Sequence, residues 1–294
     1  MPWIPRGLRD GIVTTRYPRR PDGYGEGFRG RVVVHPGGDG DLRAGSIAEA
    51  CPTDAISIDA GQFCLDRGRC IMCGRCVELY PEVFEFEPDF ETSAIGRDRL
   101  VVPDREEDDA SVARTRSELA RRVKALRRSV HIRHLDAGSD GAEEWEVAAL
   151  TNPVYDVQRL GIYFTASPKH ADLLLVTGVG AAGMLRSLQH TFEVMPEPKV
   201  VIAAGADAIS GGLIGHGYAA RGGIAESVPV DVYVPGSPPT PFGLLHGILL
   251  AVGLLPEARR PSTPPASNAR RSVRPGTAVP GPSTPEDPPT EAGP

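Results

Sequence analysis

The sequence predicts two folded parts of different class: a small α+β domain, followed by an α/β domain built on a four-stranded parallel sheet. In the first part, three short apolar segments surround turns that carry cysteines; they lie at 31–35, 55–59 and 62–66. In the second part, four apolar runs each end at a turn and are separated by segments of helix length; they lie at 130–136, 171–178, 199–205 and 231–236. Strands that alternate with helices in this way form a parallel sheet that the helices cover.

These patterns divide the 294 residues into an N-terminal domain, a charged helical connector, the α/β domain and a proline-rich tail, at 1–100, 101–129, 130–256 and 257–294. The N-terminal domain begins with a short amphipathic helix, because Ile4, Leu8 and Ile12 are spaced four apart. The tail cannot bury a core, so we expect it to be disordered.

With 32 basic and 38 acidic residues, the composition gives no sign of a surface for nucleic acid and no polybasic patch for a membrane. The longest apolar stretch, 242–255, is too short to span a membrane, and the N-terminus lacks the apolar core of a signal peptide. We therefore expect a cytoplasmic protein, in which thiols stay reduced and clustered cysteines bind metal rather than form disulfides.

All five cysteines lie between positions 51 and 76. Cys70, Cys73 and Cys76 keep a C-x₂-C-x₂-C spacing, but Tyr80 stands where a fourth cysteine would precede a proline. Cys51 is followed by proline, as the remote fourth ligand is in two-cluster ferredoxins. The spacing therefore predicts a ferredoxin-type site in which these four cysteines ligate one 4Fe–4S cluster.

A second cluster would need thiols at four pseudo-symmetric positions, which hold other residues: Asp41, Ala44, Ile47 and Tyr80. Cys64 lies outside the spacing, and we interpret it as a strand residue packed as a small hydrophobe. Zinc binding and a site that no longer binds metal are the alternatives. Zinc is usually held by paired C-x₂-C units or by mixtures of cysteine and histidine, so the pattern favours iron–sulfur.

A glycine-rich loop offers a different function. Gly178, Gly180 and Gly183 form G-x-G-x-x-G between a predicted strand and a predicted helix, and Asp207 follows the next strand, where a ribose-binding acid would lie. This pattern would make the chain a nucleotide-dependent oxidoreductase. Two features weaken it: the loop is apolar and rich in alanine, and the strand before it is not the first of its domain.

Several stretches of the second half together resemble a known family: "DAGS" with "EVAALTNPVYDVQRLGI", "ASPKHADLLLVTG", "MPEPKVVIAAGADAISGG" and "VDVYVPGSPPTP". They are similar to the small, 20-kDa-type subunit of respiratory complex I and of membrane-bound NiFe hydrogenases such as formate hydrogenlyase, over about residues 130–255. The sheet that the resemblance implies is flavodoxin-like. The first hundred residues, with "YGEGFRGRVVVHP" and "CIMCGRCVELYP", resemble the two-cluster ferredoxin-type subunit of the same complexes. The chain thus resembles a fusion of these two subunits.

In the small subunit that the second half resembles, four cysteines hold a proximal 4Fe–4S cluster. The matching positions here carry no thiol; they are Asp140, Glu143, Asp207 and Ser237. Iron–sulfur clusters select thiolates, so the resemblance implies that the proximal cluster is absent. The carboxylates would raise one another's pKa, bind a hard cation such as Mg²⁺, or face basic residues of a partner. Glu144 matches an acid in the hydrogenase pattern.

The resemblance implies an iron–sulfur subunit that lies on the cytoplasmic face of the membrane and transfers electrons or acts without catalysis. Its partners would be a large hydrogenase- or complex I-type subunit and the membrane subunits of the same complex. Two alternatives stay open: a stand-alone ferredoxin-type electron carrier, and the nucleotide-dependent oxidoreductase that would use the loop from Gly178 to Gly183.

Overall fold

The computed structural model describes most of the chain up to residue 255, in the ranges 3–20, 28–35, 44–59, 61–103, 114, 117–119, 121–123 and 129–255. The charged connector predicted at 101–129 falls only partly within these ranges. The proline-rich tail predicted at 257–294 lies outside them, as does Asp41.

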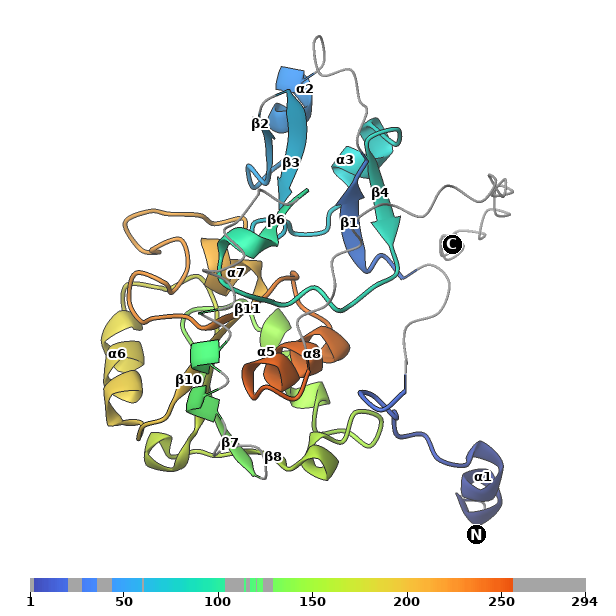
Figure 1. The fold of residues 1–294 in the computed structure, drawn as a ribbon, viewed down its shortest axis with the longest axis vertical. Helices are drawn as coiled ribbons and strands as arrows, with labels where there is room; N and C mark the ends of the chain where they lie inside the picture. Colours follow the sequence, from blue (N-terminus) through green and yellow to red (C-terminus); the bar gives the residue numbers. More distant parts are fainter. Residues whose placement is uncertain are drawn as a thin grey trace, which may run out of the picture. The chain divides into compact units, whose positions relative to one another are not determined.

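A sheet of six strands, in the order β5-β11-β10-β9-β7-β8, organises the second half (Figure 1). Its members are β5 (Ala94–Ile95), β7 (Val130–Asp136), β8 (Ile162–Phe164), β9 (Leu173–Thr177), β10 (Val200–Ala204) and β11 (Val232–Val234). Five strands run parallel, and β5 pairs antiparallel with β11 at the edge. Counted along the chain, the parallel strands have the order 2-1-3-4-5, which is the flavodoxin-like topology.

The prediction of four strands is therefore wrong, although all four predicted runs are strands of this sheet. The two additional strands have only two and three residues, β5 and β8. Such short segments show no periodicity that separates them from loops. In addition, β5 comes from the N-terminal part of the chain, so no pattern within the second half announces it.

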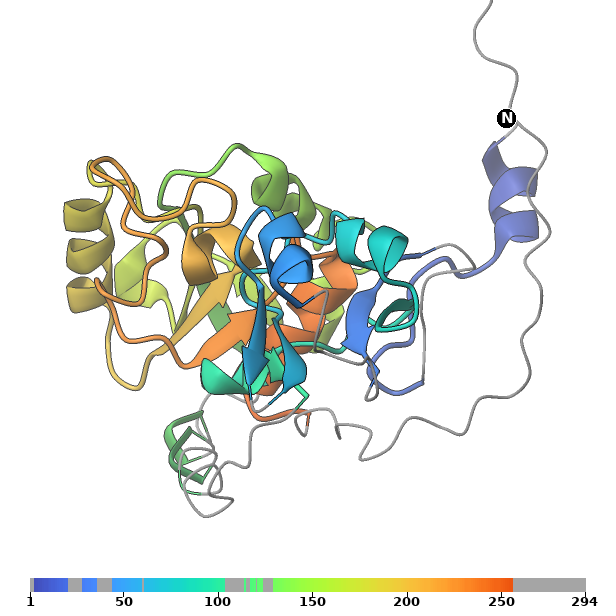
Figure 2. The same cartoon turned by 90° about the horizontal axis from the view of Figure 1, so that it is seen from above.

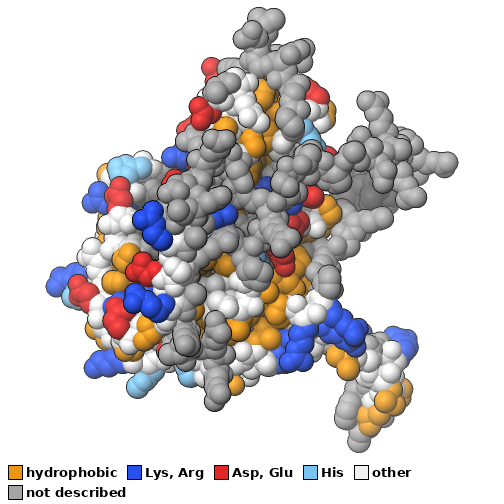
Figure 3. Space-filling view, in the orientation of Figure 1, with side chains coloured by type: hydrophobic (Ala, Val, Ile, Leu, Met, Phe, Trp, Pro, Cys, Tyr) orange, Lys and Arg blue, Asp and Glu red, His pale blue; other side chains and the backbone are white. Residues whose placement is uncertain are grey.

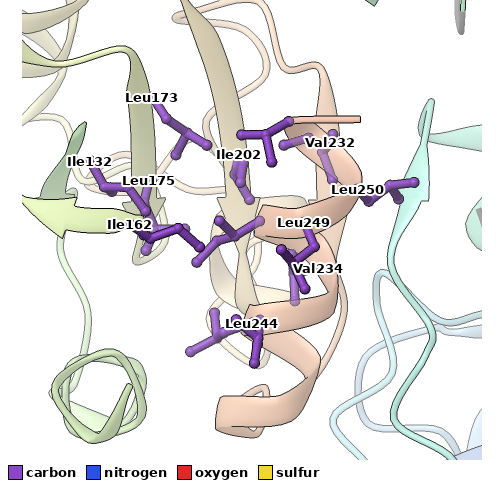
Figure 4. Packing of buried hydrophobic residues seen from close by; sticks show 14 of the residues in the cluster. Ile132, Ile162, Leu173, Leu175, Ile202, Val232, Val234, Leu244, Leu249 and Leu250 are labelled. Carbon is purple, nitrogen blue, oxygen red and sulfur yellow. The ribbon is translucent and has the colours of Figure 1, made fainter. Parts of the chain in front are cut away.

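Helices bury both faces of the sheet. On one face lie α5 (Ala142–Ala149) and α8 (Pro241–Ala251), and on the other α6 (Leu185–Val194) and α7 (Gly205–Ser210). Successive residues of β9 alternate between the two cores: Leu175 packs toward α8, and Leu174 packs toward α6. Figure 4 shows α8 packed on the sheet, with Leu244 and Leu249 beside β10 and β11. Burial on both faces explains why these strands read as continuous apolar runs.

Two small antiparallel sheets form the cysteine-bearing part. One joins β1 (Arg31–Val34) to β4 (Phe84–Glu87), and the other has the order β2 (Ile56–Asp59), β3 (Gln62–Asp66), β6 (Val101–Val102). Their shared core includes Val32, Phe63, Leu65 and Phe84. The three strands predicted in this part are confirmed, whereas β4 and β6 were not predicted. Further elements include α1 (Trp3–Asp10), α2 (Ala44–Ala50), α3 (Arg75–Leu79), η1 (Asp98–Leu100), η2 (Val157–Leu160) and η3 (Pro168–His170).

The helix predicted at the N-terminus is present as α1, which ends at Asp10, so the predicted helical residue Ile12 lies beyond it; Ile4 and Leu8 are not buried. Ile4 is 46% exposed and Leu8 is 82% exposed, and hydrophobic side chains lie on the surface of this helix (Figure 3). Among the helices that the structure describes, none has both the length and the apolar character needed to cross a membrane.

One short segment belongs to both halves of the structure. Residues 94–95 pair with β11 of the large sheet, and residues 101–102 pair with β3 of the small one (Figure 2). Nearby, the Ser210 hydroxyl of α7 donates a hydrogen bond to the Gly68 carbonyl at 3.0 Å. Arg97 forms a bidentate pair with Asp66, with distances of 2.8 and 2.6 Å. The domain boundary near residue 100 stays a prediction, since the segment around it contributes to two sheets.

The glycine loop after β9 is packed against other loops of the protein. A Cβ atom on Gly178 would lie 2.5 Å from the Gly138 carbonyl carbon, and one on Gly180 would overlap the Gly223 carbonyl oxygen. Both residues also have left-handed backbone angles, with φ of +85° and +70°. The small residues thus serve close packing of backbone on backbone, which accounts for the motif without a dinucleotide.

We predict that Gly180→Ala destabilises the protein by at least ~1–2 kcal/mol, because a side chain there is strained at positive φ and meets the Gly223 carbonyl. Gly183→Ala is the matched control, since a Cβ atom there would meet nothing within 4 Å and the φ of this residue is not positive. It should change stability by less than ~0.5 kcal/mol. Chemical denaturation measures both, and equal effects of the two changes would contradict this account.

Candidate functional site

Four of the five cysteines line one cavity. Cys51 follows α2, Cys70 and Cys73 lie in the loop after β3, and Cys76 is in the first turn of α3. The walls between them include Val32, Ile56 and Leu65, whose side chains supply no competing polar group. The structure therefore brings together the four thiols that the spacing selected.

The backbone between these cysteines turns sharply. Met72 and Gly74 both have left-handed angles, with φ of +58° and +82°. A Cβ on Gly74 would lie 3.2 Å from the Phe86 ring, so glycine also suits the tight approach of β4. With the chain turned in this way, the Met72 amide donates to Cys70 Sγ at 3.4 Å. Such N–H donors stabilise negative charge on sulfur.

A second donor of the same kind serves the remote cysteine. The Ala55 amide points at Cys51 Sγ at 3.2 Å, and Asp54 before it has a φ of +50°. The Thr53 hydroxyl lies 3.6 Å from the same sulfur. The turn after Cys51-Pro52 is therefore shaped to present polar hydrogens to this thiol.

Burial raises the pKa of Cys70 to about 12, and the three neighbouring thiols add to the effect, while the Met72 amide opposes it. Burial likewise raises the pKa of Cys76. Without a metal, these two thiols are protonated at neutral pH. Loading of the site must therefore release protons, and acid must weaken it.

The chemistry of the donor set suits an iron–sulfur cluster. The four side chains that line the cavity are thiols, which are soft ligands, and backbone amides donate to two of them. Within the described ranges, no three cysteine, histidine or carboxylate side chains are arranged to hold one metal ion.

The cysteine outside the spacing and two of the pseudo-symmetric positions lie away from the cavity. Cys64 is buried on β3, where its sulfur lies 3.9 Å from the Gln62 carbonyl, and it does not line the cavity. Tyr80 packs against the core of the cysteine-bearing part, and Ile47 is buried in that core. The burial of Cys64 agrees with its interpretation as a small hydrophobe.

A second cluster of polar groups lies at the carboxyl ends of the parallel strands. Glu143 is in the first turn of α5, and Asp207 is in the first turn of α7. Burial raises the pKa of Glu143 to about 7, and the carboxylates of Asp207, Asp140 and Glu144 raise it further. Burial also raises the pKa of Asp207, again with help from Asp140 and Glu144. The negative charges of these carboxyls thus act on one another.

The other two positions of the set lie at the rim. Asp140 is exposed and accepts a hydrogen bond from the Ala142 amide at 2.9 Å. Ser237 is exposed and follows Gly236, whose carbonyl accepts from the Ala206 amide of α7 at 2.7 Å. The segment with Ser237 therefore reaches the same helix as Asp207, although no hydrogen bond joins the two side chains.

Glu144 is held in a network that the sequence did not reveal. Its two carboxylate oxygens accept from the hydroxyls of Ser139 and Thr177, each at 2.5 Å. His134 Nε2 lies 3.0 Å from the Thr177 hydroxyl, and burial lowers the pKa of this histidine. His134 and Glu144 also line a cleft of about 440 Å³. No spacing rule links residues on β7, β9 and α5, so sequence patterns could not select them together.

The flavodoxin-like sheet and the four-thiol cavity fit an iron–sulfur protein. Two family models match the chain. Residues 141–251 match the model described as NADH ubiquinone oxidoreductase, 20 kDa subunit. Residues 63–123 match the model of a 4Fe–4S single-cluster domain, a range that excludes Cys51.

Curated relatives agree with the first match. Formate hydrogenlyase subunit 7 of Escherichia coli is 39% identical over 147 residues, which are 50% of this chain and 56% of that protein. The probable membrane-bound hydrogenase subunit mbhJ of Pyrococcus furiosus is 36% identical over 152 residues, 52% of this chain and 91% of that protein. An NADH-quinone oxidoreductase subunit of Geotalea daltonii is 47% identical over 104 residues, 35% of this chain and 61% of that protein.

The chain belongs to the family of the 20-kDa subunit of NADH–ubiquinone oxidoreductase. It spans little more than half the length of formate hydrogenlyase subunit 7. The predicted resemblance of the second half is confirmed at the level of family. Ahead of it lies a match to a 4Fe–4S domain. The resemblance of the first half to a two-cluster subunit and the fusion of two subunits stay predictions. The ligand set and the number of clusters stay predictions.

We predict that the four cavity thiols of reduced, metal-free protein react with iodoacetamide at different rates at pH 8. Cys73 is exposed and should react first. Cys70 should react at least ~10-fold more slowly, because its raised pKa leaves little thiolate. Peptide mapping by mass spectrometry gives the rates, and circular dichroism verifies that the metal-free protein is folded. Equal rates in folded protein would show that the pKa of the Cys70 thiol is not raised above that of Cys73.

Proposed function

We propose that the chain is the iron–sulfur subunit of a membrane-associated oxidoreductase complex related to hydrogenase and complex I, and that it carries one 4Fe–4S cluster. The ligands are Cys51, Cys70, Cys73 and Cys76. The observation that supports this most directly is the convergence of these four thiols, from three segments, on one cavity with apolar walls.

When bound, the cluster would accept and return one electron at a time. The protein's contribution is to hold the sulfurs and to set their surroundings. Amides of Ala55 and Met72 donate to two sulfurs, which favours the more negative state and tunes the reduction potential. Val32, Ile56 and Leu65 limit the access of water to the same atoms.

In this proposal the chain has no proximal cluster, although the small subunit that it resembles holds one. The matched positions carry three carboxylates and a hydroxyl at Asp140, Glu143, Asp207 and Ser237. These are hard oxygen groups, whereas iron–sulfur clusters are held by soft thiolates. All five cysteines of the chain lie before residue 77, so none is near enough in sequence to replace them locally. The subunit then holds the electron at the cysteine cavity only.

The partners in this proposal are a large hydrogenase- or complex I-type subunit and the membrane subunits of the same complex, on the cytoplasmic face. The names of the relatives describe subunits of such assemblies. In addition, the second half exposes large hydrophobic side chains: Trp145 at 80%, Leu213 at 66% and Ile214 at 70%. Trp145 follows the carboxylates in α5, and the other two follow α7. Exposed apolar side chains of this size are typical of a surface that another chain covers.

We predict that protein purified without oxygen holds about four iron and four sulfide ions per chain. Changing any one of the four cavity cysteines to serine should remove or cripple the cluster, because each supplies one corner. Cys64→Ser is the control, since Cys64 lies outside the cavity. Iron and sulfide assays and electron paramagnetic resonance give the result. Eight irons in a well-folded sample, or loss of iron in Cys64→Ser, would refute the one-cluster site.

We also predict that the protein co-purifies with membranes from its native host. The double change Trp145→Glu and Leu213→Glu should reduce the membrane-bound fraction at least ~10-fold, because it places charge on two exposed apolar positions. Val194→Glu on α6 is the control, since this side chain is also exposed (45%) but lies on another helix. Quantitative immunoblotting of membrane fractions measures all three proteins. A wild-type protein that stays unassociated in its host would favour a stand-alone carrier.

A further inference from the structure

Glu143 is the most deeply buried carboxyl group that the structure describes, with 2% of its surface exposed. Its Oε2 atom has no hydrogen-bond partner among the described residues. The backbone of α7 closes over the other oxygen, because a Cβ on Gly205 would lie 2.7 Å from Oε1. Burial removes the hydration of this carboxylate, and a hydrogen bond from the residue's own backbone amide replaces only part of it, so the neutral acid is favoured there.

The charges that act on Glu143 all have the same sign. They come from three carboxylates: Asp207 in α7, Asp140 in the loop before α5, and Glu144 in α5 itself. The segment from Gly236 to Thr240, which contacts α7, has no titratable side chain. The His134 ring contacts the Thr177 hydroxyl, and its Nε2 atom lies 3.7 Å from the carboxylate of Glu144. These contacts are thus with Thr177 and Glu144 and not with Glu143. Like charges in one site cannot all ionise without a large cost.

Three of these acids, in the loop before α5 and in the first turns of α5 and α7, are buried to different depths. Asp140 is exposed, Asp207 is half-buried and Glu143 is buried. They also lie at the carboxyl ends of parallel strands, where flavodoxin-like sheets bind small ligands. The two less buried acids are therefore the ones that solvent reaches directly.

We propose that Asp140, Glu143 and Asp207 form a proton-binding site, in which Glu143 holds one proton for the carboxyl cluster and Asp140 and Asp207 exchange it with solvent. Uptake forms one O–H bond on a carboxylate oxygen with a proton from water, and it removes one negative charge from this edge of the sheet. No electron moves in the step. The assignment goes beyond the proposed function and does not depend on the iron–sulfur cluster at the cysteine cavity.

The direction of the pKa shifts agrees with this geometry. Burial and the neighbouring carboxylates raise the pKa of Glu143 to about 7 and raise that of Asp207 as well. Because the groups interact, the measured midpoints belong to the carboxyl cluster rather than to a single residue. Proton uptake therefore takes place near neutral pH, where an ordinary carboxyl is fully ionised.

The experiment is a titration of the full-length protein, labelled with ¹³C at side-chain carboxyl carbons and followed by nuclear magnetic resonance from pH 4 to 9. Glu143→Gln identifies the inner signal, whose midpoint we expect near 7. Asp207→Asn should lower that midpoint, because it removes a neighbouring negative charge while keeping the shape. Glu193→Gln, at an exposed position on α6, is the control and should leave the midpoint unchanged. A midpoint below 5, or one that Asp207→Asn does not lower, would overturn the proposal.

Two further measurements test the proposal, the first without relying on which carboxyl gives the resonance signal. With a pKa raised in the folded state, Glu143 favours folding below its unfolded pKa near 4.5, and this contribution is lost as pH rises through 7. Relative to Glu143→Gln, wild-type protein should therefore lose on the order of 10- to 100-fold in its folding equilibrium between pH 5 and pH 8. A pH-independent difference would contradict proton binding. The titration is then repeated with about 10 mM Mg²⁺, a cation that prefers oxygen ligands. If Mg²⁺ moves the midpoint of the Glu143 signal below 5, the site binds a cation instead of a proton.

Discussion

The burial of the large sheet on both faces is the constraint on which the second half of the molecule depends. Residues of β9 and β10 alternate between two apolar cores, so neither face can hold a polar site. Polar and charged groups are therefore confined to the loops and helix starts at the ends of the strands. This is where Asp140, Glu143 and Asp207 lie, and where the Glu144 network joins β7 to β9 at the switch point of the strand order.

The same sheet also fixes the cysteine-bearing part through one short segment. Residues 94–102 supply a strand to each of two sheets, and Gly68 after β3 contacts Ile209 of α7. A side chain on Gly68 would lie 2.8 Å from Ile209, so backbone and helix approach as closely as glycine permits. Two sequence regions that resemble separate subunits thus share strand pairing and side-chain packing. That continuity is stronger than a linker between independent domains would provide.

Strong, repeated patterns in the sequence were sufficient to predict much of this architecture. The apolar runs that became β7, β9, β10 and β11 predicted the parallel sheet, and the cysteine spacing selected the four thiols of one cavity. The strand count was wrong because β5 and β8 are too short to show a period, and β5 comes from a distant part of the chain. The network of His134, Ser139 and Thr177 around Glu144 could not be predicted, since only the fold brings those segments together. The G-x-G-x-x-G pattern suggested nucleotide binding as an alternative function. The close backbone packing at Gly178 and Gly180 explains the presence of these glycines without a nucleotide.

The two polar sites differ in what can offset the burial of negative charge. In the cysteine cavity, burial raises the pKa of the Cys70 thiol, and the cluster that we propose would replace its proton with iron, because sulfur is a soft ligand with amide donors beside it. At the sheet edge, burial raises the pKa of Glu143 in the same way, but oxygen ligands do not select iron–sulfur and the neighbours are all acids. The proton is then the smallest cation that neutralises the site without the geometry of a metal centre. If carboxyls stand at this edge in place of the family's thiols, as we propose, the subunit holds a proton there instead of an electron.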